Sequence, residues 1–207
     1  MRCSLADART SVVFGAGPPD ADVMVVGEAP GFHEDRLGVP FAGPGGALLD
    51  GLLGSVGLAR GGVYLATVVQ CRPPGNRDLQ DAEVAACEGW LFRQVALVRP
   101  LLVLALGSVA TRVLSGRPET VAALRGRPQE TRIGDHAAVL LPLYDPAAAQ
   151  YTPSMRETLA ADIALVPELL ARARGEEPPA RVIPFPAPAT SPAPPVPAQA
   201  AEQLGLF

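Results

Sequence analysis

The chain has 207 residues, 48% of them hydrophobic, and a net charge of −4, so we expect one domain with a tail rather than a protein that coats nucleic acid by bulk positive charge. Residues 1–4 contain no signal-peptide core, and no window reaches the ~20 apolar residues of a membrane helix. Because its three cysteines are too scattered for a disulfide framework, we expect a protein of the reducing cytoplasm, where spaced cysteines more often bind metal or react. We also expect a monomer.

Short apolar segments then alternate with helical patterns along the chain. The expected strands are residues 23–26, 63–69, 101–106 and 139–143. The expected helices are residues 45–56, 81–98, 108–114 and 155–174. Asp81 and Ser108 are the expected N-caps of the second and third helices. This alternation predicts an α/β fold, a three-layer α/β/α sandwich around a short parallel sheet, with ligands bound outside the carboxyl ends of the strands.

The composition changes near Gly175, which we expect to end a domain of residues 1–175. Residues 176–201 are dominated by Pro and Ala, which predicts an extended, semi-rigid linker. Residues 202–207 end in a small apolar cluster, which suggests a tethered peptide ligand.

Two loops follow predicted strands and carry residues suited to binding DNA. The first loop contains Glu28 at the mouth of the sheet, and further along it Phe41 offers a flat apolar face that can stack a base. The second loop contains Arg72, Arg77 and two prolines, which make a stiff basic loop suited to phosphate oxygens. Read alone, the basic loop would be interpreted as an ordinary solvated turn, and the alternative for Glu28 is a salt-bridged carboxylate at the rim.

Several motifs occur in a definite order along the chain. They are Gly27-Glu28-Ala29-Pro30-Gly31, Glu34-Asp35, Pro40-Phe41 with Gly43, Val63-Tyr64-Leu65, Cys71-Arg72-Pro73-Pro74 with Asn76-Arg77, Cys87, and Leu106-Gly107. The ordered set resembles type-four uracil-DNA glycosylases, the iron–sulfur, thermophile-type branch of the uracil-DNA glycosylase superfamily. The resemblance covers roughly residues 3–170.

The resemblance implies a DNA-repair enzyme that flips uracil, or a related deaminated base, out of DNA and hydrolyses the N-glycosidic bond with water. It implies that Phe41 stacks the base and that Glu34 helps to wall the pocket. It also implies that backbone groups at Gly27 and Ala29 contact the base. The carboxylate of Glu28 would position the water and stabilise an oxocarbenium-like sugar.

Two positions depart from the family pattern. Thr67 stands where the family has Asn, so one hydroxyl replaces an amide that offers both a donor and an acceptor to uracil. Asp145, in the catalytic position, stands where the family has the His of an HPA motif. A carboxylate there would repel the developing uracil anion unless burial raised its pKa. An alternative therefore stays open, a degenerate glycosylase-fold protein that binds DNA or damaged bases without excision.

A generic nucleotide-binding α/β protein is a third alternative. It is disfavoured because the chain has neither a GxGxxG motif nor a GxxxxGK[ST] motif.

The cysteines form a further set. In the iron–sulfur branch four cysteines hold a [4Fe–4S] cluster, and Cys3, Cys71 and Cys87 match three of them at the family spacing. The fourth would lie just before Met1, so we expect a misassigned or truncated start. The other interpretation is three buried free thiols in a protein without a cluster.

The terminal residues resemble the Q-L-x-L-F peptide that bacterial replication and repair proteins dock on the sliding clamp. Leu204, Leu206 and Phe207 would supply apolar anchors, Gln203 an edge hydrogen bond, and the linker reach. The other interpretation is a frayed apolar terminus.

Overall fold

The computed structural model describes residues 3–177, and its centre is a five-stranded sheet of order β2-β1-β3-β5-β4. The strands are β1 (Val23–Gly27), β2 (Tyr64–Thr67), β3 (Leu102–Leu106), β4 (Gln129–Ile133) and β5 (His136–Leu143). Neighbouring strands are parallel except β4, which pairs antiparallel with β5. Every residue of β1, β2 and β3 is buried, as expected for apolar strands covered on both faces.

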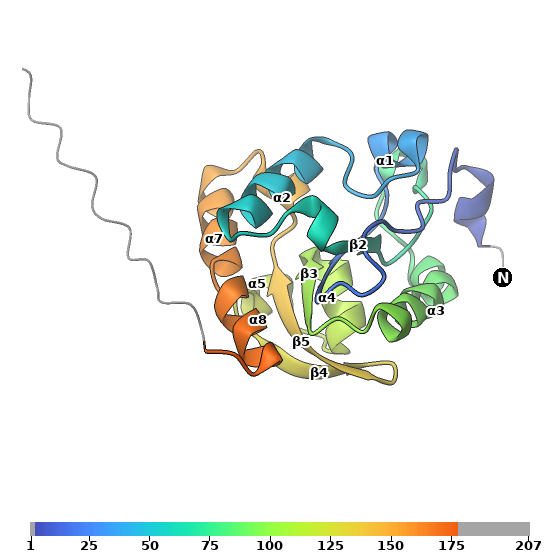
Figure 1. The fold of residues 1–207 in the computed structure, drawn as a ribbon. Coiled ribbons are helices and arrows are strands. Elements are labelled where there is room, and N and C mark those ends of the chain that lie inside the picture. Colours follow the sequence, from blue (N-terminus) through green and yellow to red (C-terminus); the bar gives the residue numbers. More distant parts are fainter. Residues whose placement is uncertain (1–2, 178–207) are drawn as a thin grey trace, which may run out of the picture.

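Helices cover both faces of this sheet (Figure 1). One face packs against α3 (Asp81–Val98) and α4 (Gly107–Ser115), and the other against α2 (Pro44–Ser55), α7 (Pro153–Ile163) and α8 (Val166–Arg174). The expected three-layer α/β/α sandwich is therefore confirmed. The shorter helical segments are Ser4–Asp7, α1 (Phe32–Leu37), Arg60–Gly62, Pro74–Asn76, α5 (Val121–Leu124) and α6 (Pro146–Ala149).

Strand β4 is the main element that the sequence analysis missed. It lies at the sheet edge, and only Ile133 among its residues is buried. An edge strand of alternating polar residues lacks the continuous apolar run that marks the central strands, so its pattern is weak.

Both predicted N-caps were wrong. Helix α3 is capped at Gln80, whose backbone N–H donates to Oε2 of Glu83 at 2.9 Å, so Asp81 is already the first helical residue. Helix α4 begins at Gly107 directly after β3, which leaves Ser108 inside the first turn. The glycine has a positive φ of 83°, which lets the chain turn sharply from strand to helix.

The closing segment is two helices rather than the single expected one. Pro167 lies in the first turn of α8, and a proline has no backbone N–H to continue the hydrogen-bond ladder of α7. No helix within residues 3–177 is long and apolar enough to cross a membrane.

Candidate active site

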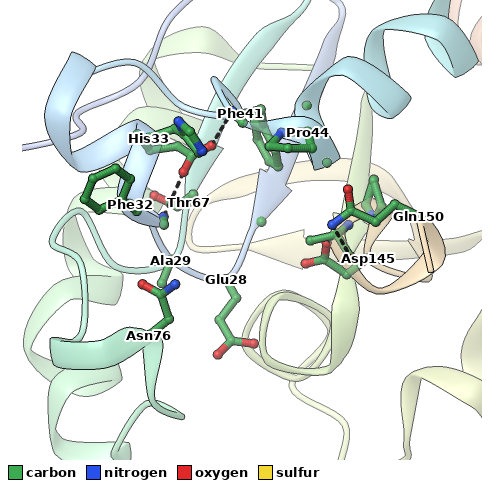
Figure 2. Close-up of a pocket in the computed structure, with 18 of the residues that line it drawn as sticks. Glu28, Ala29, Phe32, His33, Phe41, Pro44, Thr67, Asn76, Asp145 and Gln150 are labelled. Carbon is green, nitrogen blue, oxygen red and sulfur yellow. Dashed lines mark hydrogen bonds between the residues drawn. The ribbon is translucent and has the colours of Figure 1, made fainter.

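A cavity of about 410 Å³ opens at the carboxyl ends of β1, β2 and β5, where the fold predicts a ligand (Figure 2). This volume suits a small ligand such as a base. The structure brings together in this one cavity all the residues expected to bind or transform the base, namely Gly27, Glu28, Ala29, Glu34, Phe41, Thr67 and Asp145.

Phe41 packs its ring over the end of β1. A Cβ built on Gly27 would lie 2.8 Å from Cζ of Phe41, so only a residue without a side chain lets the ring approach this closely. The backbone of Phe41 is in the left-handed region, with φ 53°, which non-glycine residues rarely adopt. The ring is half-buried and borders the cavity as a flat apolar wall.

Glu34 connects two segments of the same wall. Its Oε2 accepts from the backbone N–H of Gly31 at 3.0 Å, and its Oε1 accepts from that of Gly43 at 2.8 Å. Because both carboxylate oxygens bind backbone groups, Glu34 holds the start of α1 against the segment that follows Phe41.

Thr67 is buried at the end of β2, and its hydroxyl group forms a hydrogen bond with the nearby backbone. The hydroxyl donates to the carbonyl of Val69 at 2.8 Å. Its methyl group Cγ2 lies 3.7 Å from where a Cβ on Gly27 would stand. In this arrangement Thr67 offers a ligand only a methyl group and the acceptor lone pairs of its oxygen.

Asp145 follows β5 and caps α6, because its Oδ1 accepts from the backbone N–H of Ala147 at 2.7 Å (Figure 2). It lies beside Gly107, where a Cβ would be in ordinary van der Waals contact, 3.5 Å from Oδ2. Burial raises the pKa of Asp145, although the hydrogen bond from Ala147 opposes that rise. The direction is the one that a group beside a developing anion requires.

Glu28 also has a raised pKa. Burial is the main cause, the negative charges of Asp145 and Asp78 add to it, and Arg112 opposes it. Two carboxyl groups with raised pKa values therefore line the same cavity.

Several lining residues were missed, namely Phe32, His33, Asn76, Gln150 and Tyr151. His33 lies against the backbone at Gly43, where a Cβ would be 3.3 Å from its Cδ2. Its place in the segment that follows β1 in the sequence was a usable signal. Gln150 is the C-cap of the short helix α6, and Tyr151 lies in the turn after it; the sequence shows no periodicity there.

The two arginines expected to bind DNA lie in different surroundings. Arg72 donates from Nε to Oδ1 of Asn76 at 2.7 Å, and its guanidinium lies 5.2 Å from the ring centroid of Phe32. Arg77 instead forms hydrogen bonds of 2.6 and 2.9 Å with the buried carboxylate of Glu83. The pKa of Glu83 falls to about 2, mainly because Arg77 donates to it. Phosphate binding stays a prediction for both arginines, and at Arg77 it would compete with this ion pair.

The three cysteines line a second, smaller cavity of about 230 Å³. All three are free, and Nη1 of Arg9 donates to Sγ of Cys71 at 3.0 Å. Burial raises the pKa of the Cys87 thiol. Within residues 3–177 no three metal-binding side chains are close enough to hold a single metal ion. Three cysteines that line one cavity supply the type of ligand that an iron–sulfur cluster requires.

Comparison with known proteins decides the family. The model of the uracil DNA glycosylase superfamily matches residues 14–169. The chain belongs to this superfamily. The type-4 uracil-DNA glycosylase of Sulfurisphaera tokodaii is 36% identical over 173 residues, covering 81% of this chain and 79% of that protein.

Two further relatives narrow the position within the family. The type-4 enzyme of Thermotoga maritima is 41% identical and covers 61% of this chain and 66% of its own length. The type-5 uracil-DNA glycosylase of Thermus thermophilus is 36% identical but covers only 49% of this chain and 53% of its own length. The resemblance to the type-four branch is thus confirmed over most of the chain.

Proposed function

We propose that this chain is a DNA-repair glycosylase that flips uracil, or a related deaminated base, out of DNA and hydrolyses its N-glycosidic bond. The observation that carries the proposal is the single cavity that brings Glu28, Phe41 and Asp145 together in a member of this superfamily.

The residues of the cavity divide the reaction between them. The flipped base stacks on Phe41, and this contact offsets the few kcal/mol that unstacking costs. The ionised carboxylate of Glu28 orients the attacking water and stabilises the positive charge that develops on the sugar. As the bond breaks, negative charge develops on the departing base. Asp145, whose pKa is raised, can meet that charge in its protonated form as a hydrogen-bond donor.

The rim of the cavity supports a strand of DNA. Phe32 is exposed there, with the guanidinium groups of Arg36 and Arg72 at 5.6 and 5.2 Å from its ring centroid. An aromatic face flanked by cations suits a neighbouring base and its phosphates.

The decisive experiment is a glycosylase assay on single-stranded DNA that contains uracil, hypoxanthine or xanthine. We expect base release from at least one substrate, and loss of release in Glu28→Gln. Uracil-dependent binding without release from any substrate would contradict excision and favour the alternative of a degenerate, binding-only protein.

The proposal includes a [4Fe–4S] cluster held by Cys3, Cys71 and Cys87, which a reducing cytoplasm keeps from forming disulfides and which would bind the cluster as thiolates. The group would tie the N-terminal segment to α3 and to the loop after β2, on which these cysteines lie. A protein made with a fourth cysteine three residues before Cys3 should purify brown under anaerobic conditions and contain iron. The same protein with Cys71→Ser should not. Absence of iron from the four-cysteine protein would contradict the cluster.

The proposal also includes docking of a monomer on the bacterial sliding clamp through Gln203, Leu204, Leu206 and Phe207, which lie outside the described residues. Deletion of residues 203–207 should abolish clamp binding in a pull-down and leave DNA affinity and Tm unchanged. A short linear peptide should bind at about micromolar Kd. Equal clamp binding by the intact and truncated proteins would contradict this role.

A further inference from the structure

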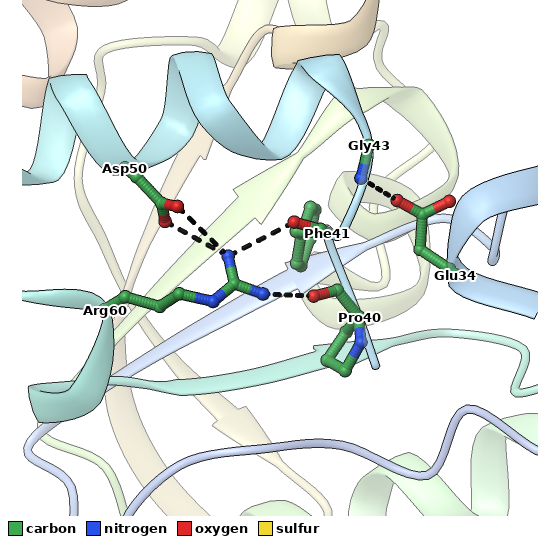
Figure 3. Close-up of polar contacts among 6 residues, drawn as sticks. All are labelled: Glu34, Pro40, Phe41, Gly43, Asp50 and Arg60. Carbon is green, nitrogen blue, oxygen red and sulfur yellow. Dashed lines mark hydrogen bonds and ion pairs between the residues drawn. The ribbon is translucent and has the colours of Figure 1, made fainter. Parts of the chain in front are cut away.

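The strained backbone of Phe41 is held in place from outside the cavity. Arg60, in the short helix Arg60–Gly62, donates from Nη1 to the carbonyl of Phe41 at 3.2 Å and from Nη2 to the carbonyl of Pro40 (Figure 3). Asp50 of α2 accepts from the same Nη1 at 3.1 Å. One guanidinium thus binds two successive carbonyls while a carboxylate orients it.

The carbonyl of Phe41 is also confined by α2. A Cβ built on Gly46 would lie only 1.8 Å from that oxygen, so the first turn of α2 approaches it as closely as a glycine allows. The φ of 53° at Phe41 turns this carbonyl toward Arg60 and Gly46, and the ring of the same residue packs over Gly27. A change in the carbonyl contacts would therefore move the ring.

Arg60 and Asp50 do not occur among the described residues that line the cavity, so neither side chain touches a base bound there. Their side chains are 31% and 41% exposed, and an ion pair at such exposure contributes little to global stability. The contacts of Arg60 with Pro40 and Phe41 are thus better explained by local geometry than by stability.

We propose that Arg60, oriented by Asp50, is a positioning residue that fixes the ring of Phe41 for stacking the flipped base. The inference rests on the proposed function, because the ring matters for catalysis only if a base stacks on it. The planar fork of arginine suits two neighbouring carbonyls, whereas lysine offers a single point charge. Arg60→Lys should therefore restore only part of the effect.

A double-mutant cycle tests the inference. Arg60→Ala should lower single-turnover uracil excision by up to about 10²-fold, the effect expected of a reacting geometry displaced by about an ångström. In a Phe41→Ala background the same substitution should have almost no further effect, because there is no ring left to position. The matched control is Arg174→Ala, which breaks another partly exposed ion pair, with Asp22, and should leave excision unchanged.

Equal effects of Arg60→Ala in both backgrounds would overturn the inference. In that case a reduced salt dependence of DNA binding would assign Arg60 to a phosphate instead. If the parent protein does not excise, the ratio of its affinities for uracil- and cytosine-containing single strands replaces the rate in the same cycle.

A crystal structure of Arg60→Ala separates the two proposals, since it does not depend on activity. We expect φ of Phe41 to leave the left-handed region and the ring to move away from Gly27. An unchanged Phe41 would overturn the inference even if the parent enzyme excises uracil. If Phe41 is displaced in Arg60→Ala but the parent protein neither excises uracil nor prefers to bind it, the result counts against the proposed function alone.

Discussion

Two sets of residues in the cavity differ in how they relate to the family pattern. The first set, Glu34 and Phe41, keeps the family residues, and hydrogen bonds between backbone groups and the side chains of Glu34 and Arg60 fix its shape. The second set, Thr67 at the end of β2 and Asp145 after β5, departs from the pattern at both positions, and these side chains bind their own local backbone. Under the proposed function, the platform for the base is retained, while the groups that would recognise and activate the base have changed.

The largest expected effect concerns the carboxylate of Glu28, which lines the same cavity as both sets of residues. Glu28→Gln should lower the excision rate by about 10²–10⁴-fold, because an amide cannot organise the attacking water as a base does. Single-turnover release of uracil measures it, and Tm serves as the folding control. A rate within about tenfold of the parent's would mean that another group positions the water.

Restoring the family residues at the two positions of the second set, Thr67 and Asp145, should raise uracil excision. Thr67→Asn with Asp145→His should increase uracil excision by about 10²–10³-fold, the usual contribution of a preorganised donor to a developing anion. Loss of the Asp145 cap on α6 should cost about 1 kcal/mol of stability, seen as a lower Tm. If the folded double variant shows no gain in uracil excision, the cavity accepts a different base.

The basic loop allows a paired test of its two arginines, Arg72 and Arg77. Arg72→Ala should weaken binding to single-stranded DNA and reduce its salt dependence, with little change in Tm. Arg77→Ala should instead lower Tm, because it leaves the buried carboxylate of Glu83 without its main donor. Equal losses of DNA affinity in the two variants would show that Arg77 leaves Glu83 to bind phosphate.

The pH dependence of Tm sharpens this pair. In the folded protein the pKa of Glu83 is about 2, below its usual 4.5, so its contribution to stability is complete above pH 4.5 and is lost as the pH falls toward 2. The Tm difference between Arg77→Ala and the parent should therefore be greatest above pH 4.5 and shrink toward pH 2. A difference independent of pH would exclude the ion pair as its source.

The smallest expected effect is a shift in the pH dependence of uracil excision. Excision should fall as the pH drops through the raised pKa of Glu28, since the ionised form acts. Asp78→Asn removes a negative charge that raises this pKa, so the acid limb of the rate profile should move to lower pH. Asp145→Asn should leave the limb in place, because the donor form proposed for Asp145 carries no charge. A shift to higher pH in Asp78→Asn would contradict the assignment of Glu28.

Much of the fold and the site could be predicted because the signals are local. The buried runs at Val23–Gly27 and Leu102–Leu106 are continuous and apolar, so central strands followed from composition and length. Loops after parallel strands meet at one edge of the sheet, which is why residues as distant in the chain as Glu28 and Asp145 line one cavity.

The amino-acid sequence by itself thus determined the sandwich, the order of the motifs and the family, which depend on periodicity and spacing. Only the tertiary structure decided three contacts. The Thr67 hydroxyl donates to the carbonyl of Val69, Arg77 forms an ion pair with Glu83, and Arg60 donates to the carbonyl of Phe41. The physical reason is that a polar side chain can bind any partner within about 3 Å, and which partner comes that close depends on how the whole chain packs.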